Sequence, residues 1–167
     1  MEKVIIKAAE FIEKMQQKDG SWYGSWAVCF TYATFFAIKG LVAAGRTYQN
    51  SVSIRKASNF LLLKQIKSGG WGENYISCHS ESPPHAVNTA WAMLGLIYAG
   101  QMERDTKPLH SAAKELINMQ LETGEFPQQD AVGNFNSSIF FNYTNYRNLF
   151  PIWALGEFHR QLHGKTG

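Results

Sequence analysis

The sequence predicts an all-α fold of about three helix pairs, arranged as part of an α/α barrel. Two observations support this prediction. A motif in which Gln is followed, after three residues, by Gly-x-aromatic occurs three times, and amphipathic segments alternate with segments that are apolar almost throughout. A unit that recurs every ~50 residues indicates a repeat architecture, in which each unit packs mainly on its neighbours. We therefore expect amphipathic helices in an outer layer and apolar helices in an inner layer.

The motif is almost unchanged between its first two copies, which lie 49 residues apart. The third copy follows after six additional residues and has Phe in place of Trp. We expect a single domain over 1–167, with repeats over about 1–50, 51–106 and 107–163. The motif residues are Gln16, Gly20 and Trp22, then Gln65, Gly69 and Trp71, and finally Gln120, Gly124 and Phe126.

The first repeat is predicted to hold two helices. Over residues 4–15 apolar side chains recur at helical spacing, with charged side chains on the opposite face. Gly20 follows this helix and tolerates the left-handed backbone conformation that often ends a helix. The second helix, from about Trp26 to Ala44, has no polar face. We expect a helix of this kind to be buried on all sides.

The other two repeats follow the same order. In the second, residues 52–63 are amphipathic and residues 86–99 are almost wholly apolar. In the third, we expect helices over about 108–121 and 143–162, with a kink in the last one at Pro151 because proline lacks the amide hydrogen. No segment of convincing length has the period of a strand.

Composition excludes several classes of protein. Hydrophobic residues make up 45% and charged residues 17%, which is typical of a globular chain. The formal charge of +3 includes no basic run, so nucleic-acid binding has little support. The longest apolar stretch is too short to span a bilayer. The cysteines, Cys29 and Cys78, are far apart in sequence, and we expect reduced, buried thiols in a protein that faces the cytosol.

Several segments carry a family resemblance. The repeat resembles the QW motif of the triterpene cyclases, and DGSWYGSWAVCFTY (19–32) is similar to oxidosqualene cyclases in particular. The plant-type enzymes, cycloartenol synthase and the amyrin-type synthases, are the most similar in our reading. Further matching segments are SGGWGENY (68–75), VNTAWAM (87–93), AGQMERD (99–105), FPQQ (126–129) and YRNLFPIWALGE (146–157).

The resemblance implies an activity. Family members are intramolecular transferases of the isomerase class that fold (S)-2,3-epoxysqualene inside an α/α barrel and cyclise it to sterol precursors or triterpene alcohols. An acid opens the epoxide, a cascade of carbocations closes the rings, and neither cofactor nor metal takes part. The family is intracellular and peripheral or monotopic on endoplasmic reticulum or lipid droplets, although we expect the membrane-binding region to be absent here.

The resemblance also implies roles for particular rings. Trp26, Tyr32, Phe135, Tyr143 and Tyr146 match or neighbour residues of the family's cavity. A ring face attracts a cation without trapping it as a nucleophile would, by roughly 2 kcal/mol or more when water is excluded. The nine motif residues are instead expected to form structural clasps, in which the Gln side chain bonds a neighbouring helix end. Trp91 and Trp153 are expected in the core.

The sequence lacks the family's acid. The proton donor of the family is the Asp of an Asp-Cys-Thr-Ala-Glu segment, and no such string occurs here. The three aspartates, Asp19, Asp105 and Asp130, are all expected in turns or loops rather than on an inner helix. We therefore assign no catalytic residue and expect the chain to be inactive alone. Its expected partners are a hydrophobic isoprenoid and either another copy or a missing N-terminal half.

Two other functions fit the same fold. One is a non-catalytic helical-repeat protein that binds a hydrophobic ligand or another chain through apolar faces left open at the ends of the array. The other is a protein prenyltransferase β-like subunit, which would need a zinc site of Asp, Cys and His ligands. The adjacent pair Cys78 and His79 lacks a third ligand, which argues against that alternative.

Overall fold

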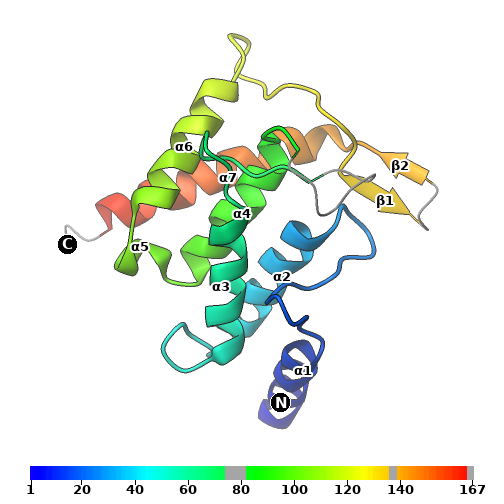
Figure 1. Cartoon of the computed structure of the whole chain (residues 1–167), viewed down its shortest axis with the longest axis vertical. Helices are drawn as coiled ribbons and strands as arrows, with labels where there is room; N and C mark the ends of the chain where they lie inside the picture. Colours follow the sequence, from blue (N-terminus) through cyan, green and yellow to red (C-terminus); the bar gives the residue numbers. More distant parts are fainter. Residues whose placement is uncertain (74–81, 136–138, 165–167) are drawn as a thin grey trace.

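The structure is a computed structural model that describes residues 1–73, 82–135 and 139–164, without the side chains of residues 134 and 135. Figure 1 shows α1 at one end of the long axis and the turn after α6 at the other. The elements are α1 (Glu2–Lys14), α2 (Phe30–Ala43), α3 (Val52–Lys64), α4 (Ala86–Tyr98), α5 (Gln101–Arg104), α6 (Lys107–Met119), β1 (Gly133–Phe135), β2 (Ile139–Phe141) and α7 (Thr144–His163).

The helices form the two expected layers. In the inner layer, α4 packs between α2 and α7. In the outer layer, α1 contacts α2, α3 contacts both α2 and α4, and α6 contacts both α4 and α7. Each outer helix after the first therefore connects its own repeat to the preceding one. This arrangement confirms the prediction of an all-α fold with alternating layers.

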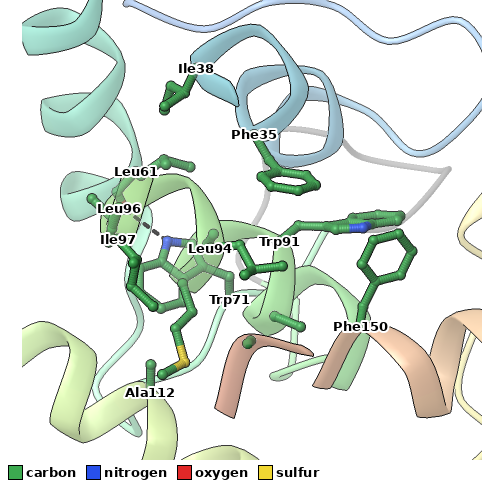
Figure 2. Packing of buried hydrophobic residues seen from close by; sticks show 14 of the residues in the cluster. Phe35, Ile38, Leu61, Trp71, Trp91, Leu94, Leu96, Ile97, Ala112 and Phe150 are labelled. Carbon is green, nitrogen blue, oxygen red and sulfur yellow. Dashed lines mark hydrogen bonds between the residues drawn. The ribbon is translucent and has the colours of Figure 1, made fainter. Parts of the chain in front are cut away.

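The core is centred on α4. Twelve of its thirteen residues are buried, and only Tyr98 is partly exposed. Figure 2 shows Trp91 and Leu94 of α4 among side chains from α2, α3 and α7. The apolar face of each neighbouring helix therefore packs against α4.

The prediction that the helix of 26–44 is buried on all sides was wrong. Six of the fourteen residues of α2 are buried, and Phe36 keeps 43% of its surface exposed. The reason is position in the array, because α4 has an inner helix on both sides whereas α2 has one on only one side. The same explanation accounts for exposed Leu149 and Ile152 on α7.

The predicted start of this helix at Trp26 was also wrong. Residues 26–28 are not helical, with the Val28 amide donating to the Val132 carbonyl at 2.9 Å and Ala27 bridging Gly133. The helix begins at Phe30 because the Glu73 carboxylate accepts hydrogen bonds from the amides of residues 29–31. A carboxylate satisfies donors that have no partner within the first turn of a helix.

Two further features differ from the sequence prediction. The antiparallel hairpin of β1 and β2 was not predicted, since strands of three residues are too short for their period to be recognised. The four-residue helix α5 was missed because it is also too short to show a period. α7 is one continuous helix with Pro151 inside it, and the kink expected at this residue stays a prediction.

The glutamines of the first two repeat motifs make two hydrogen bonds each. The Gln16 amide donates to the carbonyl of Gly20 in its own turn and to that of Ser53 in α3, both at 2.9 Å. Gln65 does the same with Gly69 and Pro108, both at 2.8 Å. These bonds connect the first two motifs to the first turn of the next outer helix.

The tryptophans of the first two motifs bond to the outer helix of their own repeat rather than to the next outer helix. The indole of Trp22 donates to the Ile12 carbonyl and that of Trp71 donates to the Leu61 carbonyl, each at 2.7 Å. Figure 2 shows the Trp71 ring against Leu61 and Ile97. In the third copy Phe126 has no such donor, and Gln120 bonds the Gly124 carbonyl at 2.8 Å.

The expectation of two reduced thiols was wrong for Cys29, which is disulfide-bonded. Distance along the sequence did not reveal that the cap of α2 places Cys29 beside Glu73, with the Cys29 amide 3.0 Å from the carboxylate. Segment 74–81 follows Glu73 directly and contains the other cysteine, Cys78, which lies outside the described residues.

Candidate functional site: an aromatic cluster on the inner helices

Aromatic rings from all three inner helices meet at Trp91. The Trp91 ring is fully buried and lies 5.2 Å from Tyr32, 5.4 Å from Phe150 and 6.2 Å from Tyr146 between centroids. All three contacts are edge-to-face, with interplanar angles of 62–78°. This geometry places the positive edge of one ring against the negative face of another and favours a fixed arrangement. Figure 2 shows the Trp91 and Phe150 rings side by side.

The cluster continues along α7 to the hairpin. Tyr146 packs 5.0 Å from Tyr143, which in turn packs 4.9 Å from Phe141 of β2. The rings therefore form a continuous series in space, in which Tyr32 is followed by Trp91, Tyr146, Tyr143 and Phe141. The structure brings together three of the five rings selected from the sequence: Tyr32, Tyr143 and Tyr146.

The other two selected rings are placed differently. Trp26 lies in the non-helical segment before α2, and 61% of its surface is exposed. Its neighbours Ala27 and Val28 pair with the backbone of residues 132–133, so Trp26 adjoins the hairpin rather than opening an inner helix. Phe135 is the last residue of β1, opposite Ile139, and its side chain lies outside the described part of the structure.

The phenol of Tyr32 is held in its neutral form by its surroundings. Burial raises the pKa of Tyr32 above its ordinary value, and the nearby Tyr146 raises this pKa further. A phenol that does not ionise leaves the ring faces as the main source of negative potential. The buried indole N–H of Trp91 is a hydrogen-bond donor that has no acceptor within the described residues.

The ring of Trp153 in the inner layer contacts the positively charged side chain of Lys39. The ammonium of Lys39 lies 4.3 Å from the centroid of Trp153, in a cation–π contact between α2 and α7. Trp153 also stacks on Phe150, with centroids 6.0 Å apart, and contacts Phe35 at 5.9 Å. It is partly exposed, so the expectation of a core position holds only in part.

None of the aspartates is placed as a buried acid. All three are exposed: Asp19 accepts from Ser21, Asp105 accepts from the Lys107 amide, and the Asp130 backbone carbonyl bonds His85. Within residues 1–73, 82–135 and 139–164, no three His, Cys, Asp or Glu side chains converge as a metal site would require. In this part of the chain no aspartate therefore lies buried among the rings of the cluster.

Two polar side chains, buried His85 and partly exposed Gln129, join α4 to the connection after α6. His85 is the N-cap of α4, where its Nδ1 accepts from the Val87 amide at 3.1 Å and its Nε2 lies 3.0 Å from the Asp130 carbonyl. Gln129 accepts from the Ala86 amide and donates to the Pro84 carbonyl. Burial lowers the pKa of His85, so the neutral ring with its proton on Nε2 fits both bonds.

Sequence reasoning missed the central residue of the cluster. Trp91 was assigned to the core, and it is buried, but it also joins Tyr32 to Tyr146. The spacing of Tyr146 and Phe150, four residues apart on one helix, was a usable signal that both rings face the same neighbour. That this neighbour is Trp91 depends on the packing of α7 against α4.

One hollow beside the described residues does not coincide with the cluster. It measures about 740 Å³ and is lined in part by Lys64, Trp71, Glu73 and Pro83, with none of the five selected rings. We assign it no role. Among the described helices, none combines the length and apolar character needed to cross a membrane.

Comparison with known proteins identifies the family. The family model of the squalene-hopene cyclase C-terminal domain matches residues 1–160. The chain is 46% identical to an alpha-onocerin synthase of Lycopodium clavatum over 96% of its length. It is 40% identical to the lanosterol synthase of Homo sapiens over 92%, and 45% identical to that of Saccharomyces cerevisiae over 95%.

The aligned part is a limited share of each relative. In these three comparisons the chain covers 22% of the relative's own length. The match nevertheless includes all three repeats and the aromatic cluster between them. On the matched family model and the identities to these synthases, the chain belongs to the terpene cyclase family of squalene-hopene and oxidosqualene cyclases, to whose C-terminal domain it corresponds.

Proposed function

We propose that this chain supplies part of the aromatic wall that stabilises carbocations in an oxidosqualene cyclase type of triterpene synthase. The observation that supports this most directly is the continuous series of rings Tyr32, Trp91, Tyr146 and Tyr143 across the three inner helices. The substrate class is (S)-2,3-epoxysqualene, and the products are sterol precursors or triterpene alcohols.

The rings would act by fixed electrostatics. Edge-to-face contacts hold each ring in one orientation, so its negative face needs no reorganisation when positive charge develops nearby. An apolar surround also excludes the water that would quench a cation. Trp26 and Phe135, which adjoin the cluster through the hairpin, belong to the same proposed wall.

The chain is proposed to need a second protein segment for turnover. The family's Asp-Cys-Thr-Ala-Glu acid is absent from the sequence, and all three aspartates are exposed. The apolar side chains of Phe36, Leu149 and Ile152 on the inner helices are also exposed, at 43%, 56% and 58%. A competent cavity therefore requires further helices that cover this face and supply the acid.

The test is a complementation assay. The purified chain is incubated with 2,3-epoxysqualene alone and together with the N-terminal part of a lanosterol synthase that ends where the similarity begins. We expect cyclised product only from the mixture, identified by gas chromatography and mass spectrometry. Product from the chain alone would contradict the absence of an initiating acid, and product from neither would contradict the proposed cyclase role.

A matched pair of variants links any activity to the cluster. Tyr146→Leu removes a ring in contact with Trp91, Tyr143 and Phe150. Tyr48→Leu removes a tyrosine that packs instead under the Arg104 guanidinium, 3.5 Å from its ring centroid. We expect Tyr146→Leu to reduce kcat at least tenfold or to change the product mixture, and Tyr48→Leu to change neither.

The non-catalytic alternative makes a different prediction in the same experiment. A helical-repeat protein that merely binds a hydrophobic ligand would quench or shift tryptophan fluorescence on addition of epoxysqualene without forming product in either incubation. The exposed apolar side chains on α2 and α7 are the observation that keeps this alternative under test.

A further inference from the structure

Trp91 is enclosed by the rings of the aromatic cluster. It has 0% of its surface exposed, whereas Tyr32 and Tyr146, which it contacts from α4, are both partly exposed. A side chain without accessible surface cannot touch a substrate, so Trp91 can act only through its neighbours. Its burial is complete within this chain, and further protein segments around the cluster would not change it.

Trp91 differs from the tryptophans of the repeat motifs in the way it is held. The indoles of Trp22 and Trp71 each donate to a backbone carbonyl at 2.7 Å. The buried indole of Trp91 has no such acceptor within the described residues. A buried donor without an acceptor lowers stability. Trp91 therefore contributes through the size and shape of its ring, which packs on other rings, and not through a hydrogen bond.

The ring of Tyr32 is confined by Trp91 and by Gly24. The centroid of the Trp91 ring lies 5.2 Å from that of Tyr32. A Cβ built at Gly24 would lie 2.7 Å from Cδ1 of Tyr32, closer than side-chain atoms approach each other in proteins, so the ring packs directly on the Gly24 backbone. Phe36, which also contacts Tyr32, is on the same helix and is 43% exposed. The orientation of Tyr32 therefore depends mainly on Trp91 and on the space left by Gly24.

The orientation of a ring decides what it can stabilise. An aromatic ring has a negative face and a positive edge, and a cation is attracted only when it lies over the face, within about 6 Å of the centroid. Trp91 contacts Tyr32 on α2 and Tyr146 on α7, so it determines where these two faces lie relative to each other. If either ring turned, the point at which positive charge is stabilised would move.

We propose that Trp91 is a positioning residue, which fixes the rings of Tyr32 and Tyr146 relative to each other and thereby selects the carbocation that they stabilise. The role in positioning follows from the contacts of Trp91, whereas the role in product choice rests on the proposed function. Trp91→Leu removes the ring and frees both tyrosines to turn. Trp91→Phe keeps a ring in the same place and should restore most of the wild-type behaviour.

The first test locates the Tyr32 ring in the purified chain by NMR. The nuclear Overhauser effect between the Tyr32 ring protons and the α-protons of Gly24 reports their close approach. We expect Trp91→Leu to lose roughly half or more of its intensity, because Tyr32 can move into the cavity left by the ring. Phe158→Leu is the matched control, since it removes a buried ring of α7 that packs on His110, and it should leave the effect unchanged. An unchanged effect in Trp91→Leu would overturn the positioning role. Trp91→Met, which fills the site with a flexible side chain, replaces Trp91→Leu if that variant does not fold.

The second test compares products in the complementation mixture. We expect Trp91→Leu to change the ratio of the two main products by roughly threefold or more, Trp91→Phe to restore it, and Phe158→Leu to leave it as in the wild type. Gly24→Ala, which displaces Tyr32 without touching Trp91, should also change the ratio. A changed Overhauser effect with an unchanged product ratio would overturn the role in product choice. No product from the wild-type mixture would overturn the proposed function and this role with it, while the NMR measurement would still decide the positioning of Tyr32.

Discussion

The inner helices α2 and α4 are similar in composition but differ in their surroundings. Both are apolar almost throughout, yet α4 is enclosed by α2, α7, α3 and α6, whereas α2 leaves Phe36 and Gly40 exposed. The difference shows that in a repeat array the burial of a residue depends on whether repeats flank it on both sides. Local sequence specifies which helices are inner, and the number of neighbours specifies how completely they are buried.

The largest expected difference is between two ring deletions. Trp91→Ala on α4 should lower the free energy of unfolding by about 3–5 kcal/mol, because a large cavity opens where four rings meet. Phe36→Ala on α2 should cost about 1 kcal/mol or less, since 43% of this side chain is already exposed. Urea unfolding followed by circular dichroism measures both, and equal losses would contradict the comparison.

The next effect concerns the Glu73 carboxylate that caps the N-terminus of α2. Glu73→Ala leaves the buried amides of residues 29–31 without their acceptor, and we expect a loss of roughly 3 kcal/mol. Glu73→Gln is the matched control, because it keeps one acceptor oxygen and should lose less. The thermal unfolding midpoints of both variants test this expectation. An unchanged midpoint in Glu73→Ala would show that α2 does not need this cap.

The second and third clasps should differ in their contribution to stability, as α4 and α2 do. Gln65→Ala removes a bond within its turn and one to α6, at a cost of about 2 kcal/mol, whereas Gln120→Ala removes a single exposed bond and should cost about 0.5 kcal/mol. Both are compared at concentrations where the chain is monomeric. If Gln120→Ala proved as costly as Gln65→Ala, the inter-repeat bond would not be the source of the difference.

The smallest effect is expected from pH at the N-terminus of α4. Burial lowers the pKa of His85 in the folded chain below its ordinary value of about 6.5, so the unfolded chain binds a proton first as pH falls. Stability should be complete above pH 6.5 and decline below it. His85→Asn keeps a side chain suited to an N-cap and should lessen this decline, which parallel urea titrations at pH 5.0 and 7.0 would detect. A decline that is the same in His85→Asn would exclude His85 as its source.

The parts that sequence predicted well are those governed by local pattern. The helical periods gave the two layers, and the spacing of Gln16, Gly20 and Trp22 pointed to a turn that joins neighbouring helices. The parts that it missed depend on contacts between distant residues. Glu73 caps a helix more than forty residues earlier, and this contact determines where α2 begins and where Cys29 lies.

The same distinction between local pattern and contacts of distant residues applies to the candidate site. Tyr143 is the N-cap of α7 and Tyr146 lies in its first turn, so their proximity follows from nearness along the chain at the start of one helix. Their connection to Tyr32 runs through Trp91, which no local pattern distinguishes from an ordinary core tryptophan. Trp26 was misplaced because its apolar surroundings in sequence suggested a helix, whereas the backbone there pairs with residues 132–133.

The central position of α4 has a consequence for synthesis of the chain. α4 ends at Tyr98, whereas α7, which covers one of its sides, is complete only at His163, 65 residues later. At roughly 5–20 residues per second, the ribosome needs about 3–13 s to add them. Throughout that interval the nascent chain presents an uncovered apolar helix, which is the kind of surface that chaperones bind. The residues that make α4 the most protected part of the finished molecule thus make it the most vulnerable part of the unfinished one.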